Sequence, residues 1–170
     1  MNTAFFFKRL LIIVSISAVV VMSVVALSVT RVSLTELPIA HEHDRIVLVN
    51  FWSISCPTCV SELPLIKKVW SDFHNKGFNV VGVSMWYDGR DEFNKFSSRN
   101  KQLFPYPVLI DSDKKIQQRF GGIYATPTSF LVNVADGSIR KRYLGKIDPT
   151  ELYRDINNAL PSKFNQVVSY

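Results

Sequence analysis

The sequence predicts an α/β fold in which a mixed central sheet is flanked by helices and preceded by one N-terminal transmembrane helix. Three observations lead to this fold class. Short apolar runs rich in β-branched residues alternate with segments of helical character, and the last two runs are joined by a turn sequence. In addition, residues 10–30 contain no charged side chain. The chain has 170 residues, which is enough for one domain of ordinary size.

Residues 10–30 form an apolar segment long enough to cross a bilayer as a helix. Lys8 and Arg9 precede it, so the positive-inside rule leaves residues 1–9 in the cytoplasm and exports the rest. Cleavage as a signal peptide is the alternative. The segment is longer than most signal-peptide cores, however, and Ala26-Leu27-Ser28 matches an A-x-A cleavage site poorly. We therefore expect an uncleaved signal anchor.

The exported part is predicted to consist of a connector at 31–44, a folded domain at 45–162 and a C-terminal tail at 163–170. A fully extended connector would span at most about 50 Å, which holds the domain close to the membrane. The net charge of +6 is partly concentrated at 140–146, which we interpret as a solvated surface. Nucleic-acid binding is excluded for an exported domain without a matching motif.

Within the domain, each element follows from its residues in chain order. Arg45 to Trp52 is a continuous β-branched and aromatic run, which predicts a buried strand. Pro57 suits the first turn of a helix. We expect this helix to be kinked at Pro64 and to end at about Lys76, because Gly77 follows. The remaining expected elements are a strand at 78–85, a helix at 91–101, a strand at 106–110, a helix at 113–120, strands at 128–133 and 138–144, and a helix at 149–160.

Two signals define the end of the domain. Ala135-Asp136-Gly137 lies between the last two strands and predicts a hairpin, and antiparallel pairing is expected only there. Asp148 is expected to cap the final helix, with Pro149 at its first position. The order of elements, β-α-β-α-β-α-β-β-α, gives a mixed sheet with helices on both faces.

Both cysteines lie in Cys56-Pro57-Thr58-Cys59, directly after the first predicted strand. At the start of a helix, two thiols with this spacing can close and open a disulfide with little backbone movement. Cys56 is expected at the N-cap, where free backbone N–H groups and the helix dipole lower its thiol pKa, so it is the attacking cysteine. Cys59 lies one turn further on and is the resolving cysteine. A purely structural disulfide is disfavoured because the closed loop is too short to restrain the unfolded chain.

A zinc site formed by His41, His43 and the two cysteines is the metal alternative. The strand between the two pairs spans roughly seven residues at about 3.3 Å each, which separates them by more than about 20 Å. Zinc ligands must lie within about 2.3 Å of one ion. We therefore expect no metal and no other cofactor, and we interpret the two histidines as exposed connector residues.

Glu62 follows Cys59 by three positions and should share its helix face. It either accepts the proton of the resolving thiol or is a plain surface glutamate. Partial burial would raise its pKa toward the working range.

Pro127 directly precedes a predicted strand. If its peptide bond is cis, it lies next to the cysteines and presents the backbone of Thr126 to an extended peptide, although an isolated X-Pro bond is usually trans. Thr126, Pro57 and Trp52 are the candidates for contact with a substrate, Trp52 being expected to pack beneath the site.

These residues resemble the thioredoxin superfamily and, more closely, its exported, membrane-anchored branch typified by TlpA, ResA and DsbE. The matches are IVLVNFWSISCPTCVSELP at 46–64, YPVLIDSD at 106–113 and GGIYATPTSFLV at 121–132. The resemblance implies a thioredoxin-like fold, a thiol-disulfide oxidoreductase activity, an active-site role for Glu62 and a cis bond before Pro127. It also implies a bacterial inner-membrane location with the catalytic domain on the periplasmic side.

The implied reaction is reduction of disulfides in cysteine-containing protein substrates, including apocytochrome c during cytochrome c maturation. A membrane electron-donor protein would restore the dithiol, and a monomer is expected. Asn50 stands where soluble thioredoxins carry a buried aspartate, which leaves Glu62 as the better proton acceptor.

Two features depart from this branch. Ser55 stands where the family normally has tryptophan, so the surface that docks partners is altered, and the connector is too short for the usual N-terminal β-hairpin. A disulfide oxidant or isomerase of the same fold is the alternative function. A copper-handling module of this fold is less favoured, because it needs a histidine well downstream of the cysteines and the last one is His74.

Overall fold

The computed structural model describes residues 30–40 and 42–160. In chain order, the helices and strands are β1 (Ile46–Trp52), α2 (Pro57–Phe73), β2 (Phe78–Ser84), α3 (Arg90–Arg99), β3 (Val108–Ile110), α4 (Lys115–Arg119), β4 (Thr128–Asn133), β5 (Ile139–Leu144) and α5 (Pro149–Ala159). Almost all of the predicted anchor at 10–30, together with residues 1–9 and the tail at 163–170, lies outside this part. No helix within it is long and apolar enough to span a membrane.

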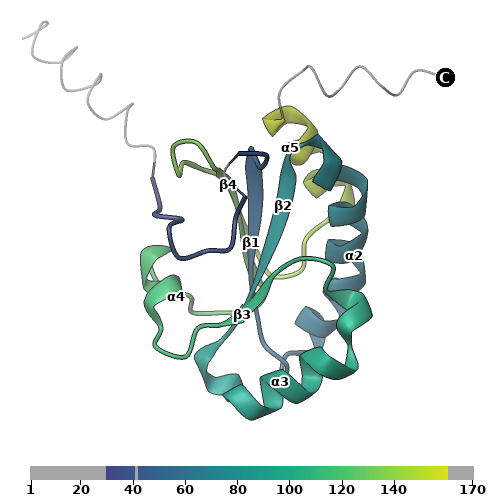
Figure 1. Cartoon of the computed structure of the whole chain (residues 1–170), viewed down its shortest axis with the longest axis vertical. Helices are drawn as coiled ribbons and strands as arrows, with labels where there is room; N and C mark the ends of the chain where they lie inside the picture. Colours follow the sequence, from purple (N-terminus) through teal and green to yellow (C-terminus); the bar gives the residue numbers. More distant parts are fainter. Residues whose placement is uncertain (1–29, 41, 161–170) are drawn as a thin grey trace, which may run out of the picture. The chain divides into compact units, whose positions relative to one another are not determined.

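The strands form one mixed sheet in the order β3-β2-β1-β4-β5. β1, β2 and β3 are parallel, with Trp52 beside Ser84 and Ser84 beside Ile110. α2 and α5 lie on one side of the sheet and α4 on the other (Figure 1). The predicted α/β class, with a mixed sheet between helices, is therefore confirmed for the described residues.

The direction of β4 corrects one expectation, because β4 runs antiparallel to β1 as well as to β5. The reason lies in the connection before it. β3 ends at the same end of the sheet as β1, and α4 has only five residues, which rise about 7.5 Å. Such a helix is too short to carry the chain back across the sheet. β4 therefore starts where β1 and β3 end, with Thr128 beside Phe51.

We call this end of the sheet the disulfide end. β1, β2, β3 and β5 finish there and β4 begins there. Most predicted elements have slightly shorter bounds than expected, and a 3-10 turn at Trp86–Asp88, which was not predicted, follows β2. The helix that begins at Pro57 continues through Pro64, becomes a 3-10 turn at His74–Lys76 and ends at Gly77, whose φ of 88° favours glycine.

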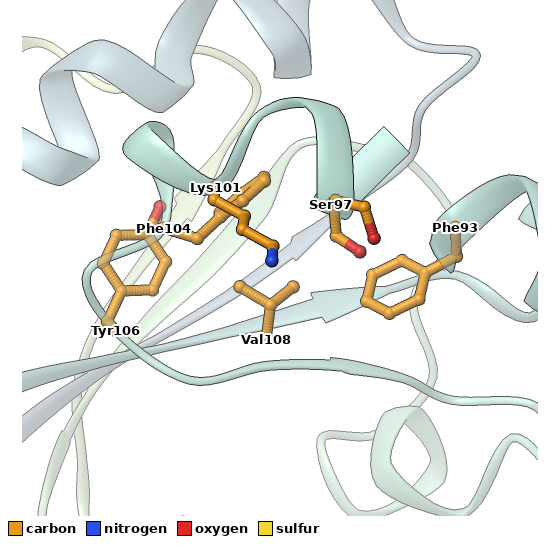
Figure 2. Close-up of a pocket in the computed structure, with 7 residues that line it drawn as sticks. Phe93, Ser97, Lys101, Phe104, Tyr106 and Val108 are labelled. Atoms are coloured by element: carbon orange, nitrogen blue, oxygen red, sulfur yellow. The ribbon is translucent and has the colours of Figure 1, made fainter. Parts of the chain in front are cut away.

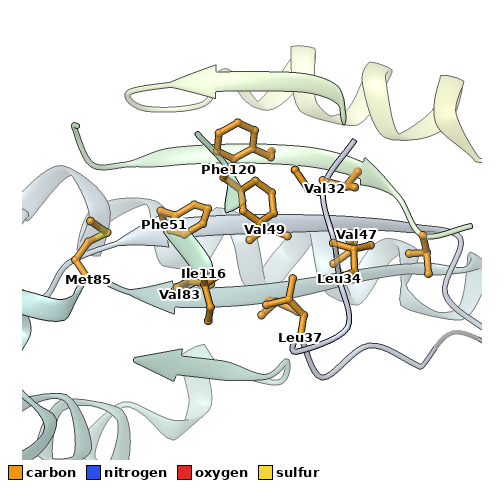
Figure 3. Packing of buried hydrophobic residues seen from close by; sticks show 14 residues of the cluster. Val32, Leu34, Leu37, Val47, Val49, Phe51, Val83, Met85, Ile116 and Phe120 are labelled. Carbon is orange, nitrogen blue, oxygen red and sulfur yellow. The ribbon is translucent and has the colours of Figure 1, made fainter. Parts of the chain in front are cut away.

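Residues 31–39 differ most from expectation, because they pack on the domain instead of forming a free connector. Val32, Leu34 and Leu37 are 7%, 5% and 6% exposed, and they join the core cluster between the sheet and α4. Figure 3 shows these side chains turned toward the strands. The Val32 N–H donates to the Gly137 carbonyl at 2.8 Å, and Arg31 forms an isolated antiparallel bridge with Ser138. The compact unit therefore begins at Arg31.

Candidate active site

The two cysteines lie at the point where β1 passes into α2. Cys56 is the N-cap residue, with an extended backbone, and Pro57 occupies the first turn, as predicted. The Cys59 N–H donates to Cys56 Sγ at 3.1 Å. The two cysteines form a disulfide with a Cα–Cα separation of 5.2 Å. Once this bond is reduced, the same N–H and the positive end of the helix dipole would stabilise a Cys56 thiolate.

The two sulfur atoms are not equally accessible. Cys56 is half-buried and follows the exposed Ser55, whereas Cys59 is only 1% exposed. Cys59 packs in a small core cluster with Trp52, Leu63 and Phe93. A thiolate on an incoming protein can therefore reach Cys56 more easily than Cys59, which matches the order of attack expected from the sequence.

Glu62 is buried on the helix face that carries Cys59, with 2% exposure. Its Oε1 accepts a hydrogen bond of 2.6 Å from the N–H of Ile147, the residue before the N-cap of α5. Burial raises the pKa of Glu62, while the Ile147 hydrogen bond and the charge of Lys146 act in the opposite direction. The alternative of a plain surface glutamate is therefore excluded.

The loop before β4 approaches the disulfide from the other side. The Thr126–Pro127 peptide bond is cis, as the resemblance implies, and the Thr126 carbonyl oxygen lies 3.6 Å from Cys56 Sγ. The loop is fixed by a 2.8 Å hydrogen bond from the Gly145 N–H to the Pro127 carbonyl. A second one, of 2.7 Å, runs from Thr128 Oγ1 to the Ala125 carbonyl. Backbone groups of this loop are thus held next to Cys56 Sγ.

Trp52 corrects one of the proposed substrate contacts. Its side chain is 1% exposed and packs against the rings of Phe96 and Phe104, with ring centroids 5.6 Å apart in each case. It supports Cys59 from below and offers no surface to a substrate. Asn50, two residues earlier, is also buried and donates to Ser129 Oγ at 2.9 Å.

Asp88 is a residue of the site that no pattern in the sequence predicts. It is 9% exposed and lies in the 3-10 turn after β2. Its carboxylate accepts hydrogen bonds from Ser53 Oγ at 2.5 Å, from the Ile54 N–H at 3.0 Å and from Ser84 Oγ at 2.5 Å. Ser53 Oγ in turn accepts from the Ser55 N–H at 3.1 Å. Asp88 therefore anchors the loop that delivers Cys56 to the start of α2.

A cavity of about 390 Å³ lies between α3 and β3, but neither cysteine lines it. Figure 2 shows the Lys101 amine extending among Phe93, Tyr106 and Val108. The Tyr106 hydroxyl is buried without a hydrogen-bond partner in the described part of the chain, and burial raises its pKa. The cavity touches the cluster beneath the disulfide through Phe93 and Val108, and we assign it no chemistry.

The groups considered for zinc are not assembled here. His43 is exposed, His41 lies outside the described residues, and the two cysteines are joined to each other. Among residues 30–40 and 42–160, no three acidic, histidine or cysteine side chains gather in a way that could hold a metal ion.

A sheet of this topology, with a disulfide at the N-terminus of the helix after its central strand, defines the thioredoxin-like class. The family model described as AhpC/TSA matches residues 19–142. The chain belongs to the AhpC/TSA family, whose domain is thioredoxin-like.

The chain is also similar to individual proteins. It is 29% identical over 115 residues to the thiol-disulfide oxidoreductase ResA of Bacillus thuringiensis, covering 68% of this chain and 64% of ResA. It is 31% identical over 103 residues to the thiol:disulfide interchange protein DsbE of Haemophilus influenzae, covering 60% and 52% of the two chains. The chain thus spans about 64% of the length of the first of these relatives.

Among solved structures, the chain resembles a protein of Neisseria meningitidis provisionally named a thioredoxin. The TM-score is 0.63 and the identity 35%, with 76% of this chain and 82% of the other covered.

Proposed function

We propose that this protein is a thiol-disulfide oxidoreductase that reduces disulfide bonds in cysteine-containing proteins. The observation that carries the proposal is the Cys56–Cys59 disulfide at the N-terminus of α2, with the Cys59 N–H directed at Cys56 Sγ. The names of the ResA and DsbE relatives support the same reaction class. The chemistry needs no metal or other cofactor, because the two sulfur atoms carry both electrons.

The reduced protein begins the reaction. The Cys56 thiolate attacks one sulfur of the client disulfide, forms a mixed disulfide and releases the other client sulfur as a thiolate. Cys59 then loses its proton and attacks Cys56 Sγ, which releases the second client thiolate and leaves the Cys56–Cys59 disulfide. The client has gained two electrons and this protein has lost two.

Glu62 accepts the proton of Cys59 in the second step. Its burial on the same helix face and its raised pKa both make it a better proton acceptor for Cys59. The Thr126 and Pro127 backbone, beside Cys56 Sγ, receives the extended client segment, and Pro57 lies at the exposed rim of the site.

The cellular setting is part of the proposal. The charge-free segment at 10–30, preceded by Lys8 and Arg9, supports a single-pass anchor in a bacterial inner membrane with the folded unit on the periplasmic side. A membrane electron-donor protein then restores the dithiol. The resemblance to the DsbE branch supports apocytochrome c as one client in cytochrome c maturation, and we propose a monomer.

Trapping of the mixed disulfide tests the reaction. In Cys59→Ala, Cys56 still attacks a client but nothing resolves the adduct, so non-reducing electrophoresis of the native membranes should show stable adducts that disappear with reductant. The matched control is Cys56→Ala, which keeps Cys59 but should trap almost nothing because Cys59 is buried. Equal trapping by both variants, or by neither, would contradict the proposed roles.

The reduction potential tests the direction of electron flow. We expect the Cys56–Cys59 pair, equilibrated with glutathione, to be more reducing than the glutathione couple. A potential near that of strong oxidants, about −120 mV, would instead support the alternative function as a disulfide oxidant.

A further inference from the structure

Four large apolar side chains are exposed in the part of the chain that the structure describes. They are Trp86, Tyr87, Tyr124 and Leu144, with 44%, 49%, 91% and 67% exposure. Single exposed apolar residues are common on protein surfaces, whereas a group of them at one place marks an interaction site. The fold places all four at one end of the sheet.

All four lie at the disulfide end of the sheet. Trp86 and Tyr87 follow the end of β2, whose Ser84 pairs with Trp52 just before the disulfide loop. Leu144 ends β5 beside Thr128, the first residue of β4. Tyr124 belongs to the loop whose Thr126 oxygen lies 3.6 Å from Cys56 Sγ. We call these four residues the apolar rim.

One half of the rim is held against the loop before Cys56. Asp88, next to Tyr87, accepts hydrogen bonds from Ser53 and Ile54, so the turn that carries both aromatic residues is fixed to that loop. The Trp86 and Tyr87 rings meet edge to face at a centroid distance of 5.6 Å. The Lys114 amine lies 3.8 Å from the Trp86 ring centroid and covers one face of it.

The other half belongs to the opposite side of β1, because β2 lies on one side of this strand and β4 and β5 lie on the other. Tyr124 is 91% exposed, so the fold itself gains almost nothing from its ring. Leu144 is tied to the same loop through the next residue, because the Gly145 N–H donates to the Pro127 carbonyl. Between the two halves, the exposed residues around Cys56 are small or compact: Ser55, Pro57 and Thr58.

We infer that the apolar rim selects clients whose reactive cysteine has large apolar neighbours on both sides in an extended segment. This inference rests on the proposed function and names the substrate class of the same site. A client cysteine that reaches Cys56 sits over the small residues, and its neighbours along the chain reach Trp86 and Tyr87 on one side and Tyr124 and Leu144 on the other. The rim thereby supplies apolar contact area on both sides of the small residues around Cys56.

The arrangement fits a polypeptide better than a lipid surface. A membrane would contact one continuous apolar patch, whereas the rim is divided by the disulfide and its small neighbours. The backbone of Thr126 beside Cys56 Sγ is also suited to hydrogen bonding with an extended peptide.

The test compares two short peptides, each with a single cysteine linked through a disulfide to thionitrobenzoate. One peptide has Phe and Leu on each side of the cysteine, and the other has Ser and Gly. The reduced full-length chain in lipid nanodiscs attacks the peptide cysteine, and the thionitrobenzoate anion leaves and absorbs visible light. We expect the apolar peptide to react about tenfold faster, the ratio given by partial burial of one large apolar side chain.

The rim variants identify the residues responsible. Tyr124→Ser and Trp86→Ser should each reduce the ratio by severalfold through weaker peptide binding, with little change in the rate at saturating peptide. Tyr124→Phe keeps the ring and should keep the ratio. Arg142→Ser is the control for position, since Arg142 precedes Leu144 by two residues on the same face of β5 and lies further from the disulfide.

Three results would overturn the inference. If both peptides react equally with the native chain, the rim does not select clients, although the proposed function stands. If bromine-labelled lipids quench Trp86 fluorescence while the peptide rates stay equal, the rim is a membrane contact. If neither peptide nor 2-hydroxyethyl disulfide reacts, the proposed function fails and the inference fails with it.

Discussion

Glu62 and Asp88 are both buried carboxylates that lie near the Cys56–Cys59 disulfide in space, but different contacts hold them. Asp88 accepts hydrogen bonds from two serine hydroxyls and one backbone N–H. Glu62 accepts one hydrogen bond, from the Ile147 N–H, and burial raises its pKa. One carboxylate joins the loop before Cys56 to β2, and the other lies on the helix behind Cys59.

This difference in hydrogen-bond partners suggests two roles: Asp88 anchors a loop, and Glu62 takes part in proton transfer. A carboxylate surrounded by donors fixes the groups that donate to it, and its removal leaves several buried donors without an acceptor. A carboxylate with few donors in an apolar setting binds a proton more readily, which suits a group that takes a proton from a thiol. We therefore expect Asp88 variants to change stability and Glu62 variants to change kinetics.

The largest effect is expected for Asp88→Ala. It leaves the Ser53 and Ser84 hydroxyls and the Ile54 N–H without their acceptor, at about 1 kcal/mol each. The free energy of unfolding, measured in urea, should therefore fall by about 3 kcal/mol. Asp88→Asn keeps one carbonyl oxygen and should lose about half as much. A variant as stable as the native chain would show that Asp88 is not an anchor.

Glu62→Gln should slow the resolving step by about 100-fold at neutral pH, because the amide cannot take the Cys59 proton. Stopped-flow measurement of the lifetime of the mixed disulfide tests this value. Glu151→Gln is the control, because it makes the same change at a carboxylate of a different helix, in the first turn of α5. An unchanged lifetime in Glu62→Gln would assign Glu62 a structural role like that of Asp88.

The raised pKa of Glu62 also predicts how the free energy of unfolding changes with pH. The pKa of Glu62 is raised in the folded protein, so the folded state holds the proton more tightly than the unfolded state, whose pKa is about 4.5. As the pH rises from 4.5 through the folded pKa, the native chain should lose stability relative to Glu62→Gln. Urea titrations of both proteins across this range measure the difference, and a difference of the opposite sign would contradict the buried state of Glu62.

The smallest effect is expected at the cap of α5. The Asp148 carboxylate accepts the Glu151 N–H at 2.8 Å, so Asp148→Ala should cost about 1 kcal/mol of stability. It should also change the lifetime of the mixed disulfide less than twofold, because the Ile147 N–H that holds Glu62 belongs to the backbone before the cap and is kept. Thr150→Ala, in the same turn, is the matched control. A large kinetic change in Asp148→Ala would show that the start of α5 controls Glu62.

The parts of the site that the sequence predicted depend on local signals. β1, the N-cap at Cys56 and the cap at Asp148 each follow from a few adjacent residues, and all three are confirmed. Asp88 has no such signal, because its partner Ser53 lies 35 residues away in the sequence. The direction of β4 depends on how short α4 is, and helix ends are poorly determined by propensity alone.

Residues 31–39 carry a local pattern that is consistent with their packing on the domain. Val32 and Leu34 alternate with polar residues, and Leu37 follows three positions later, as in a segment with one buried face. Their burial depends on the open face of the sheet beside α4, which sequence spacing alone does not show.

The packing of this segment has a practical consequence for preparing a soluble fragment. Cutting the chain at Arg45, where the first strand was predicted to begin, would remove three buried side chains and uncover Val47 and its neighbours. At about 1.5–2 kcal/mol each, the loss is about 5 kcal/mol, which is comparable to the whole stability of a small domain. A fragment meant for crystallisation or redox titration should therefore begin before Val32.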